Sequence, residues 1–342
     1  MRIVVTGHKG YIGAVLVGML ISAGHQVRGL DIGLFDNAWC GPRVPEPRGM
    51  FLDIRDTEAE HFADTDAVIH LAALSNDSLG AMDPQLTNEV NYQASVRLAS
   101  AAKEAGVERF LFSSSCSIYG FNEEEPRTEN SETFPLTEYA KSKVETERSL
   151  SILACSTFAP TFLRNATVYG FSPRLRTDLV VNQLTATALV EKEIELKSDG
   201  SAWRPFIHVE DVARAFVSLL EAPISIVGNQ IYNVGIDGQN FRVRDIAEIL
   251  SEEVLDARVV VSPFASTDHR SYKVSFAKLT REVPSFKPQW TVRDGIRQLI
   301  DEFSRNTIQF PQLTGSTFHR LDSLMEGIER GKFRRDLRPL AD

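Results

Sequence analysis

The feature that most constrains this chain is its first stretch, a strand, a glycine turn, an apolar helix and a second strand that ends in an acid. The β-branched run RIVVT indicates a buried strand, and the apolar run after the glycines indicates a helix. In order, the parts are a strand over 2–6, Gly7, Gly10 and Gly13 at intervals of three, a helix over 14–23 that stops at Gly24, a strand over 25–30, and Asp31. This order is typical of a dinucleotide-binding βαβ unit.

Each residue type suits that chemistry. Gly7 permits the tight turn out of the strand, and Gly10 lets the backbone approach a pyrophosphate at the helix N-terminus. Gly13 lets the helix pack close to the strand. Asp31 lies where a carboxylate can accept hydrogen bonds from the adenosine ribose, and it would repel a 2′-phosphate. NAD is therefore favoured over NADP.

Composition limits the other classes of protein. The chain has 342 residues with 43% hydrophobic content, enough for one large α/β domain or two interlocked ones. A net charge of −9 argues against a non-specific nucleic-acid surface, and the longest apolar run, 14–23, is too short to span a membrane. Cys40, Cys116 and Cys155 are too widely spaced for a disulfide framework or a zinc site, and the seven histidines do not cluster. We therefore expect no metal, no signal peptide and a reducing, cytoplasmic location.

Strands and helices alternate through about residue 170, which predicts a parallel, doubly wound sheet. The expected strands are 49–52, 67–73, 109–113, 161–164, 194–196 and 230–234. The expected helices are 84–106, 137–154, 179–190, 243–250 and 292–303. The second half is less regular, and the last thirty residues show no readable chemistry.

A second pattern is the YxxxK pair of Tyr139 and Lys143. Residues four apart share a helix face, so Lys143 is expected near the phenol. A cation there, with an oxidised nicotinamide, lowers the phenol pKa, so that Tyr139 can act as a general base near neutral pH. Taken alone, such a pair fits a solvated helix face better. Here Ser115 follows a predicted strand 24 residues earlier, which allows its hydroxyl to face the same substrate oxygen.

With these residues the sequence resembles the extended short-chain dehydrogenase/reductase family, and within it the NAD-dependent nucleotide-sugar epimerases and dehydratases. The motifs are TGHKGYIG, LDIRD, HLAA, FSSSCSIYG, YAKSK, RNATVYG and DGSAWRPFIHVEDVARA, spread over about residues 1–300. The resemblance implies an α/β fold with a Rossmann-type doubly wound parallel sheet and a smaller C-terminal substrate-binding part. We expect an NAD-binding domain over 1–170, to which 204–236 returns, and a substrate-binding part over 171–203 and 237–342.

The resemblance also implies a catalytic set and a cofactor site. Tyr139 matches the residue that removes a proton from a sugar hydroxyl, usually at C4. Lys143 matches the residue that holds the nicotinamide ribose, and Ser115 the one that hydrogen-bonds the reacting oxygen. The residues expected to contact NAD are Gly7, Gly10, Tyr11, Ile12, Gly13, Asp31, Asp53, Ile54, Leu71, Ala72, Ala73, Asn91, Ser113, Tyr139 and Lys143.

On the substrate side, Asn165 matches an asparagine close to the sugar diphosphate, and Arg204 an arginine that contacts it. Arg270 is similar, with a looser match, to a second phosphate-binding arginine. Guanidinium groups suit phosphate oxygens, although a surface ion pair is the plain alternative for each. Asp77 lies in the loop expected over the sugar pocket. The residues expected to contact the substrate are Asn76, Ser115, Tyr139, Asn165, Arg204 and Arg270.

The sequence departs from the dehydratase pattern after Ser115. In the 4,6-dehydratases of the family, Asp and Glu stand where this chain has Cys116 and Ser117. Serine is a poor base, so the usual 4,6-dehydration is disfavoured, and epimerases commonly carry small residues there. A thiol can act as an acid or a base if its pKa falls, and a 5,6-dehydratase of the family places a cysteine here. Cys116 is therefore a candidate catalytic residue, beside the alternative of a small buried filler.

These observations predict an NAD-dependent enzyme that epimerises a nucleoside-diphosphate sugar through a 4-keto intermediate, with C4 as the expected carbon. A nucleotide-sugar 4-dehydrogenase or ketoreductase and a dehydratase that uses Cys116 are the alternatives. A non-catalytic NAD-binding regulator fits less well, because the Ser115, Tyr139 and Lys143 set is intact. No nucleic-acid or membrane partner is expected. Family likeness further implies a homodimer through residues 84–106 and 137–154.

Overall fold

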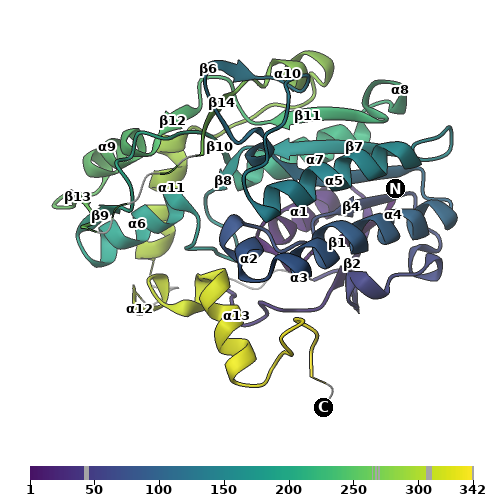
Figure 1. Cartoon of the computed structure of the whole chain (residues 1–342), viewed down its shortest axis with the longest axis horizontal. Helices are drawn as coiled ribbons and strands as arrows, with labels where there is room; N and C mark the ends of the chain where they lie inside the picture. Colours follow the sequence, from purple (N-terminus) through teal and green to yellow (C-terminus); the bar gives the residue numbers. More distant parts are fainter. Residues whose placement is uncertain (42–45, 264, 266–267, 269, 306–309, 341–342) are drawn as a thin grey trace.

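A seven-stranded parallel sheet forms the centre of the protein (Figure 1). The computed structural model describes residues 1–41, 46–263, 265, 268, 270–305 and 310–340. In spatial order the strands are β11 (Gln230–Val234), β7 (Ala159–Asn165), β5 (Arg109–Ser115), β4 (Ala67–His70), β1 (Arg2–Thr6), β2 (Gln26–Asp31) and β3 (Arg48–Phe51). Every neighbouring pair is parallel. The order reverses between β1 and β4, which is where doubly wound sheets bind ligands.

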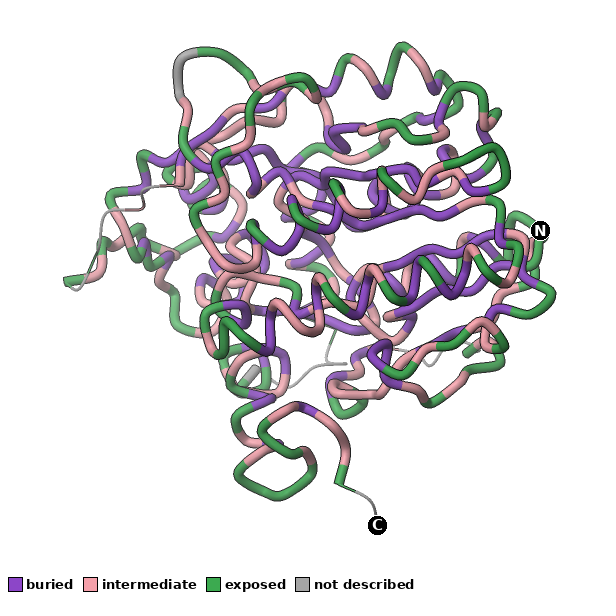
Figure 2. The backbone as a smooth tube through the Cα atoms, turned by 45° about the vertical axis from the view of Figure 1, so that its right-hand side comes forward, coloured by how far each residue is buried: buried purple, intermediate pink, exposed green. Residues whose placement is uncertain are grey.

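Two layers of helices bury the two faces of this sheet. On one face, α1 (Tyr11–Ser22) and α7 (Val209–Glu221) lie side by side, and Leu16 and Phe216 share one core. On the other, α4 (Ala94–Glu104) and α5 (Glu138–Leu153) bury Leu98 and Leu150 against Phe110. Figure 2 shows the central strands buried and the outer faces of the helices exposed. The predicted α/β, Rossmann-type doubly wound sheet is confirmed.

A second group of elements lies beside the sheet and has its own core. Its helices are α6 (Val180–Val190), α9 (Val243–Glu253) and α11 (Val292–Ser304). Its strands are β8 (Thr167–Tyr169), β10 (Trp203–His208) and β12 (Asn240–Arg242) in one small sheet, and β9 (Glu193–Leu196) paired with β13 (Arg258–Val261) in another. β11 and α7 join the large sheet and its helix layer, whereas β10 lies in a small sheet. The domain boundaries remain a prediction.

The remaining elements are short. They are α2 (Asp77–Met82), α3 (Pro84–Asn88), β6 (Phe121–Arg127) paired with β14 (Ser271–Val274), α8 (Ile224–Val227), α10 (Ala277–Glu282), α12 (Phe310–Leu313) and α13 (Arg320–Glu329). No helix within the described ranges has the length and apolar character needed to cross a membrane.

Two of the differences between the structure and the sequence-based prediction bear on the site. The single helix expected over 84–106 is α3, a π-helical segment (Glu89–Gln93) and α4, because the wider π turn interrupts the regular α-helical ladder. β5 extends two residues beyond the expected strand, since Ser114 and Ser115 pair with the last residues of β7. This extension carries Ser115 to the carboxyl edge of the sheet, where the cleft lies.

Candidate active site

A cleft of about 710 Å³ lies at the carboxyl ends of β1, β2, β4 and β5. One wall comes from the large sheet and the other from α6, β9, β10 and the C-terminal residues. Of the residues predicted to contact cofactor or substrate or to carry the chemistry, all but Cys116 and Asn91 line this cleft. Segments far apart in the sequence thus meet at one site, while the role of each residue remains a proposal.

The glycine turn forms a cradle that side chains would fill. Gly7 has a φ of +71°, and a Cβ there would lie 2.8 Å from the backbone nitrogen of Ala72. A Cβ on Gly13 would lie 2.3 Å from the carbonyl oxygen of Gly7. Gly10 is the N-cap of α1, so the first amides of that helix point toward the cleft without a side chain over them. These features fit the diphosphate of NAD.

Asp31 lies at the tip of β2, beside the cradle. Its carboxylate accepts hydrogen bonds from the amides of Lys9 (3.0 Å) and Gly33 (2.8 Å), which fix its orientation. Arg28 points away and donates to the carbonyl of Ala63 and the hydroxyl of Thr65. The ammonium of Lys9 is paired with Asp36 at 2.9 Å. The nearby cations therefore already have partners, and the site suits the hydroxyls of NAD better than a 2′-phosphate.

Asp53 and Ile54, which we predict to lie at the adenine end of NAD, line the cleft. The carboxylate of Asp53 caps a short 3₁₀ segment and pairs with the buried guanidinium of Arg55 at 2.6 Å. The ion pair holds the backbone on either side of Ile54 in place. The strand end Leu71–Ala73 also lines the cleft, beside the cradle.

Ser115, Tyr139 and Lys143 all lie in the cleft lining. Burial, and then the charge of Asp77, raise the pKa of Tyr139 to about 12, while Ser115 and Arg176 partly offset that rise. Lys143 is buried and donates from Nζ to the carbonyl oxygen of Ser113 at 2.8 Å. Burial lowers the pKa of Lys143 to about 7.

In the ligand-free fold, Lys143 alone does not lower the pKa of the Tyr139 phenol; the prediction of a lowered pKa included an oxidised nicotinamide. The Lys143 ammonium lies 5.6 Å from the centre of the tyrosine ring, and its own charge is only partly retained at neutral pH. Desolvation of the phenol is then the larger effect. A lowered phenol pKa requires a bound ligand that adds positive charge.

A buried polar network lies behind the predicted catalytic residues. Glu147 of α5 accepts from Ser114 of β5 at 2.5 Å and pairs with Arg164 of β7 at 2.7 Å. Arg164 also donates to the hydroxyl of Tyr119, which donates to Asn233 of β11. The network fixes the helix that carries Tyr139 and Lys143 against the strands that carry Ser115 and Asn165. Sequence reasoning did not find it, because these positions are far apart along the chain.

Two predicted site residues lie behind the cleft. Cys116 is 1% exposed, and its thiol donates to the carbonyl of Arg164 at 3.1 Å. Burial raises the pKa of Cys116, which opposes acid–base chemistry, so the prediction of a catalytic thiol is corrected to a buried packing residue. The amide of Asn91 is buried and bonds both backbone groups of Leu74. Asn91 therefore holds the backbone of Leu74 in the cleft wall, and its contact with NAD stays a prediction.

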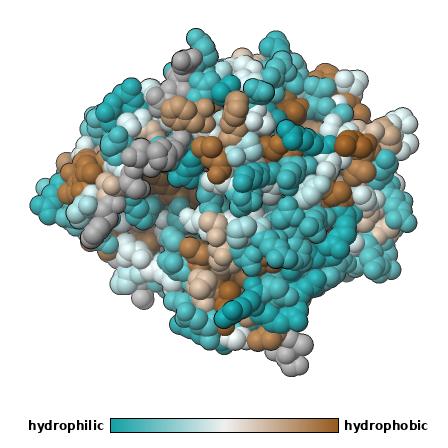
Figure 3. Space-filling view, viewed as in Figure 1, coloured by the Kyte–Doolittle hydropathy of each residue, from teal (hydrophilic) through white to brown (hydrophobic). Residues whose placement is uncertain are grey.

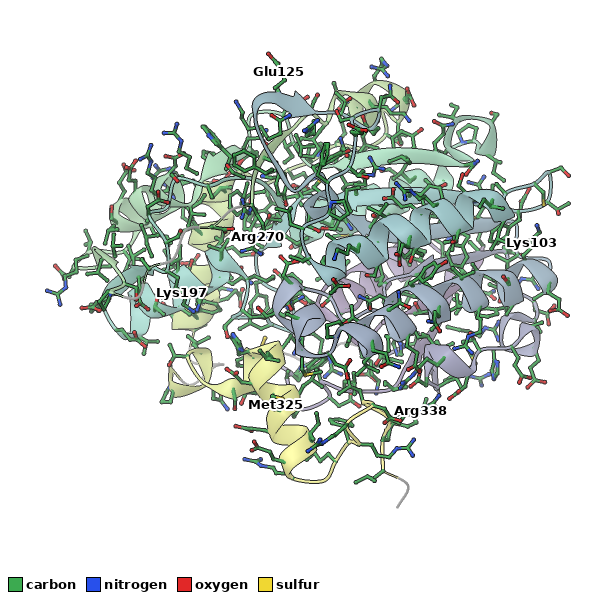
Figure 4. The ribbon with its side chains drawn as sticks, in the orientation of Figure 1. Lys103, Glu125, Lys197, Arg270, Met325 and Arg338 are labelled. Atoms are coloured by element: carbon green, nitrogen blue, oxygen red, sulfur yellow. The ribbon has the colours of Figure 1, made fainter. Side chains whose placement is uncertain are left out.

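The part of the cleft predicted to hold the sugar nucleotide, which we call the sugar end, contains a chain of alternating charges. Asp268 pairs with Arg204 at 2.7 Å and with Arg270 at 2.9 Å, and Arg270 also pairs with Asp77. Figure 4 shows Arg270 in the middle of the molecule, between its two parts. The two arginines do lie together, but two carboxylates neutralise them. The hydroxyl of Thr137, the N-cap of α5, also donates to Asp77.

The two predicted asparagines have different partners. Asn165 donates to the hydroxyl of Ser113 at 3.0 Å, and its buried side-chain oxygen has no hydrogen-bond donor among the residues described. That oxygen is free to accept from a ligand. Asn76 caps α2 through the amide of Leu79 and donates to Asp178 at 2.6 Å. It faces the cleft with its hydrogen bonds already formed.

Several charged residues in the lining were missed by sequence reasoning, among them Arg176, Asp178 and Arg320. Arg176 makes a two-pronged ion pair with Asp178 (3.0 and 2.6 Å) and donates to Ser75 at 3.0 Å. The two arginines of the segment SPRLRTD are the sequence feature from which a charged site residue could have been predicted here. Arg320 lies beyond every motif, so the sequence alone gave no indication of it.

A glycine cradle with an acid at the next strand tip, joined to a Tyr–Lys pair on a doubly wound sheet, defines an NAD-dependent enzyme of the Rossmann class. The model of the NAD dependent epimerase/dehydratase family matches residues 3–235. The chain belongs to that family, and its cofactor is NAD.

Known proteins of the family cover nearly the whole chain. A UDP-glucose 4-epimerase of Mycolicibacterium smegmatis is 31% identical over 324 residues, covering 90% of this chain and 100% of the relative. Among solved structures, a Thermotoga maritima UDP-glucose 4-epimerase with UDP-glucose gives a TM-score of 0.79 at 25% identity, covering 90% and 100%. The NDP-hexosamine 5,6-dehydratase TunA gives 0.78 at 26% identity, covering 90% and 99%.

Proposed function

We propose that this enzyme epimerises a nucleoside-diphosphate sugar at C4 through a 4-keto intermediate. The observation that carries the proposal is the meeting of Ser115, Tyr139 and Lys143 with the glycine cradle in one cleft. Cys116, the group that would favour dehydration, is buried behind the cleft. Ser117 lines the cleft but offers only a hydroxyl.

Each residue has a defined task in this reaction. NAD, when bound, supplies the chemistry of accepting hydride from C4 and returning it. Tyr139 takes the proton of the C4 hydroxyl and later gives it back, acting as general base and then general acid. Ser115 donates a hydrogen bond to the same oxygen. Lys143, anchored on Ser113 and partly charged at neutral pH, adds to the positive charge that bound NAD would place near the phenol.

The substrate is held by its diphosphate. Arg204 and Arg270 offer guanidinium groups to the phosphate oxygens once Asp268 and Asp77 release them. The unpartnered side-chain oxygen of Asn165 accepts a hydrogen bond from the ligand. The similarity to UDP-glucose 4-epimerases makes a UDP-hexose the first substrate to test.

The test is incubation of the purified enzyme with UDP-, dTDP-, GDP- and CDP-hexoses without added cofactor. We expect one sugar to be converted to its C4 epimer, with no net NADH and no loss of water from the product mass. Tyr139→Phe should reduce kcat by about a thousandfold while the amount of bound NAD stays the same. Full turnover by this variant would refute the mechanism. Stoichiometric NADH would instead indicate a dehydrogenase, and a product 18 mass units lighter a dehydratase.

We further propose a homodimer that uses the outer faces of α4 and α5, on the strength of family likeness. These helices form the solvent-facing layer on one side of the sheet. Their surface is largely hydrophilic in Figure 3, although Ile152 near the end of α5 is 84% exposed. Sedimentation of the wild type and of Ile152→Asp tests the proposal, because a dimer through this face should weaken in the variant.

A further inference from the structure

The C-terminal residues 316–340, which we call the C-terminal segment, comprise α13 and the chain after it (Figure 1). His319, Arg320 and Leu337 of this segment line the cleft. The carbonyl of Phe318 accepts from the amide of Thr177 at 3.0 Å. Leu324 and Leu337 are buried in a small core. Arg338, labelled in Figure 4, pairs with Asp56, three residues after Asp53. The segment therefore spans from the second group of elements to the adenine end of the cofactor site.

This segment places a buried guanidinium in the cleft wall. Arg320, the first residue of α13, is 2% exposed and lines the cleft. Its NH2 donates to the carbonyl of Arg174 at 3.2 Å, and its guanidinium carbon lies 4.2 Å from the centre of the Phe35 ring. Its NH1 has no hydrogen-bond partner within the described parts of the chain.

The neighbouring carboxylates do not compensate Arg320. Asp178 makes its two-pronged pair with Arg176, and Asp36 is shared between Arg174 and Lys9. No carboxylate of the described residues lies within ion-pairing distance of Arg320. Burial and the charge of Arg176 lower the pKa of Arg320 to about 9, so the guanidinium is still charged at neutral pH. A buried, unpaired cation of this kind destabilises the fold unless an anion binds beside it.

The surroundings of Arg320 indicate which anion that is. Phe35 belongs to the loop that follows Asp31, on the cofactor side of the cleft. The backbone that Arg320 contacts is bonded to the first turn of α1, because Ser172 donates to the carbonyl of Tyr11 at 2.7 Å and accepts from the amide of Arg174. Arg320 and the N-terminus of α1 thus lie in one connected unit. Arg204 and Arg270, the candidates for binding the diphosphate of the sugar nucleotide, are paired with Asp268 in another part of the cleft.

We propose that Arg320 is a ligand of the NAD diphosphate, opposite the glycine cradle, and that the C-terminal segment holds NAD on the enzyme through it. The diphosphate is then bound from two sides, by helix amides of α1 and by a guanidinium of α13. The proposal rests on the NAD site and is independent of which sugar reacts. It also holds if the enzyme proves to be a dehydrogenase.

The experiment uses the full-length chain with Arg320→Met, which keeps the length and apolar stem of the side chain and removes its charge. Arg330→Met is the matched control, because Arg330 is an exposed residue of the same segment that pairs with Glu326. Three quantities are measured for each protein: the NAD that remains bound after purification and, once this NAD has been removed, the Kd for NAD, ADP-ribose, adenosine and UDP by calorimetry and the melting temperature.

We expect Arg320→Met to lower the affinity for NAD and for ADP-ribose by about ten- to a hundredfold, which is the range expected when a charge-assisted hydrogen bond is lost. Adenosine, which lacks a diphosphate, and UDP should bind as to the wild type. The NAD-free variant should melt at the same or a higher temperature, because an unpaired buried charge is gone. A purely structural residue would instead lower the melting temperature.

Two results would overturn the proposal. One is an unchanged affinity for NAD and ADP-ribose. The other is a loss of UDP affinity as large as the loss of NAD affinity, which would assign the guanidinium to the sugar nucleotide. Arg320→Lys provides a second variant if the methionine protein does not fold. It keeps the charge but loses the fork, so its NAD affinity should lie between the wild type and a tenfold loss.

Discussion

The two ends of the cleft are built by different means. At the cofactor end, the shape of the backbone does most of the work, through the cradle of Gly7 and Gly13 and the amides that orient Asp31. At the sugar end, the surface consists of side chains, with Arg204 and Arg270 linked through Asp268. One end is formed before its ligand arrives. The other must exchange internal ion pairs for contacts with the ligand.

This difference affects ligand affinity and the response of each end to amino-acid substitution. A backbone cradle tolerates no added atoms, so its sequence is narrowly determined. A chain of alternating charges can be rearranged one side chain at a time, and each anionic ligand must compete with the resident carboxylates for the guanidiniums. The cofactor end should therefore respond to small steric changes, and the sugar end to changes of charge.

The largest expected effect is at the cradle. In Gly13→Ala the new Cβ would meet the carbonyl oxygen of Gly7 at 2.3 Å, so the loop must move, and NAD affinity should fall by about a thousandfold. The control is Gly18→Ala in the same helix, where a Cβ meets no atom within 4 Å. That control should keep NAD affinity and gain about 0.5–1 kcal/mol in unfolding free energy. Titration calorimetry measures the NAD affinity of both variants. Equal affinities would contradict a cradle whose shape determines NAD binding.

The next effect concerns Lys143, where the two ends meet. Its pKa is lowered to about 7 in the fold, against an ordinary value of 10.5. The fold therefore carries the full cost of the buried charge below pH 7, and that cost fades as the pH rises toward 10.5. NAD-free Lys143→Met should be more stable than the wild type by about 2 kcal/mol at pH 7, and this gain should shrink by pH 10.

Urea unfolding at several pH values measures this difference. The control is Lys141→Met, because Lys141 is exposed on the same helix and pairs with Glu138. Its unfolding free energy should differ from that of the wild type by the same small amount at every pH. A pH-independent gain for Lys143→Met would show that the ammonium is not destabilised in the fold.

A smaller effect is expected for the sugar end. Arg204→Met should weaken UDP binding by about tenfold, since a charged contact to phosphate is lost but Asp268 no longer has to be displaced from it. NAD affinity should not change. Arg258→Met is the control, because Arg258 lies exposed at the edge of the second group of elements, paired with Glu193. If NAD affinity fell with UDP affinity, the two ends would not be separate in the way described.

The smallest effect is expected for Asp77→Asn. Removal of this carboxylate frees Arg270 from one partner, so UDP affinity should rise by about threefold. Asp83→Asn is the control, because Asp83 caps α3 through the amide of Leu86 and asparagine caps equally well. Titration calorimetry with UDP decides between a gain and a loss. A loss would mean that Asp77 orients Arg270 for the ligand instead of competing with it.

The same division explains what the sequence could predict. Gly7, Gly10, Gly13 and Asp31 lie within one βαβ unit, so local patterns were sufficient to predict the sheet and the cofactor end of the cleft. Tyr139 and Lys143 share one helix turn, and their common position in the cleft followed from spacing.

What the sequence did not reveal depends on contacts between distant segments. Asp268 neutralises the predicted arginines, and Arg320 enters the cleft wall from the far end of the chain. Neither arrangement leaves a periodic pattern. Burial raises the pKa of Cys116 and of Tyr139, and it is likewise a property of the packed fold, because it depends on every element that covers the residue.

The buried pair of Glu147 and Arg164 has a consequence for how this enzyme can diverge. Loss of either partner alone leaves an unpaired charge in the core, at a cost of about 3–5 kcal/mol, whereas replacement of both by apolar residues is often nearly neutral. A single substitution at either position is therefore strongly destabilising, whereas a double substitution can be tolerated. We expect the two positions to covary among descendants of this chain, even where Arg204 and Arg270 have changed.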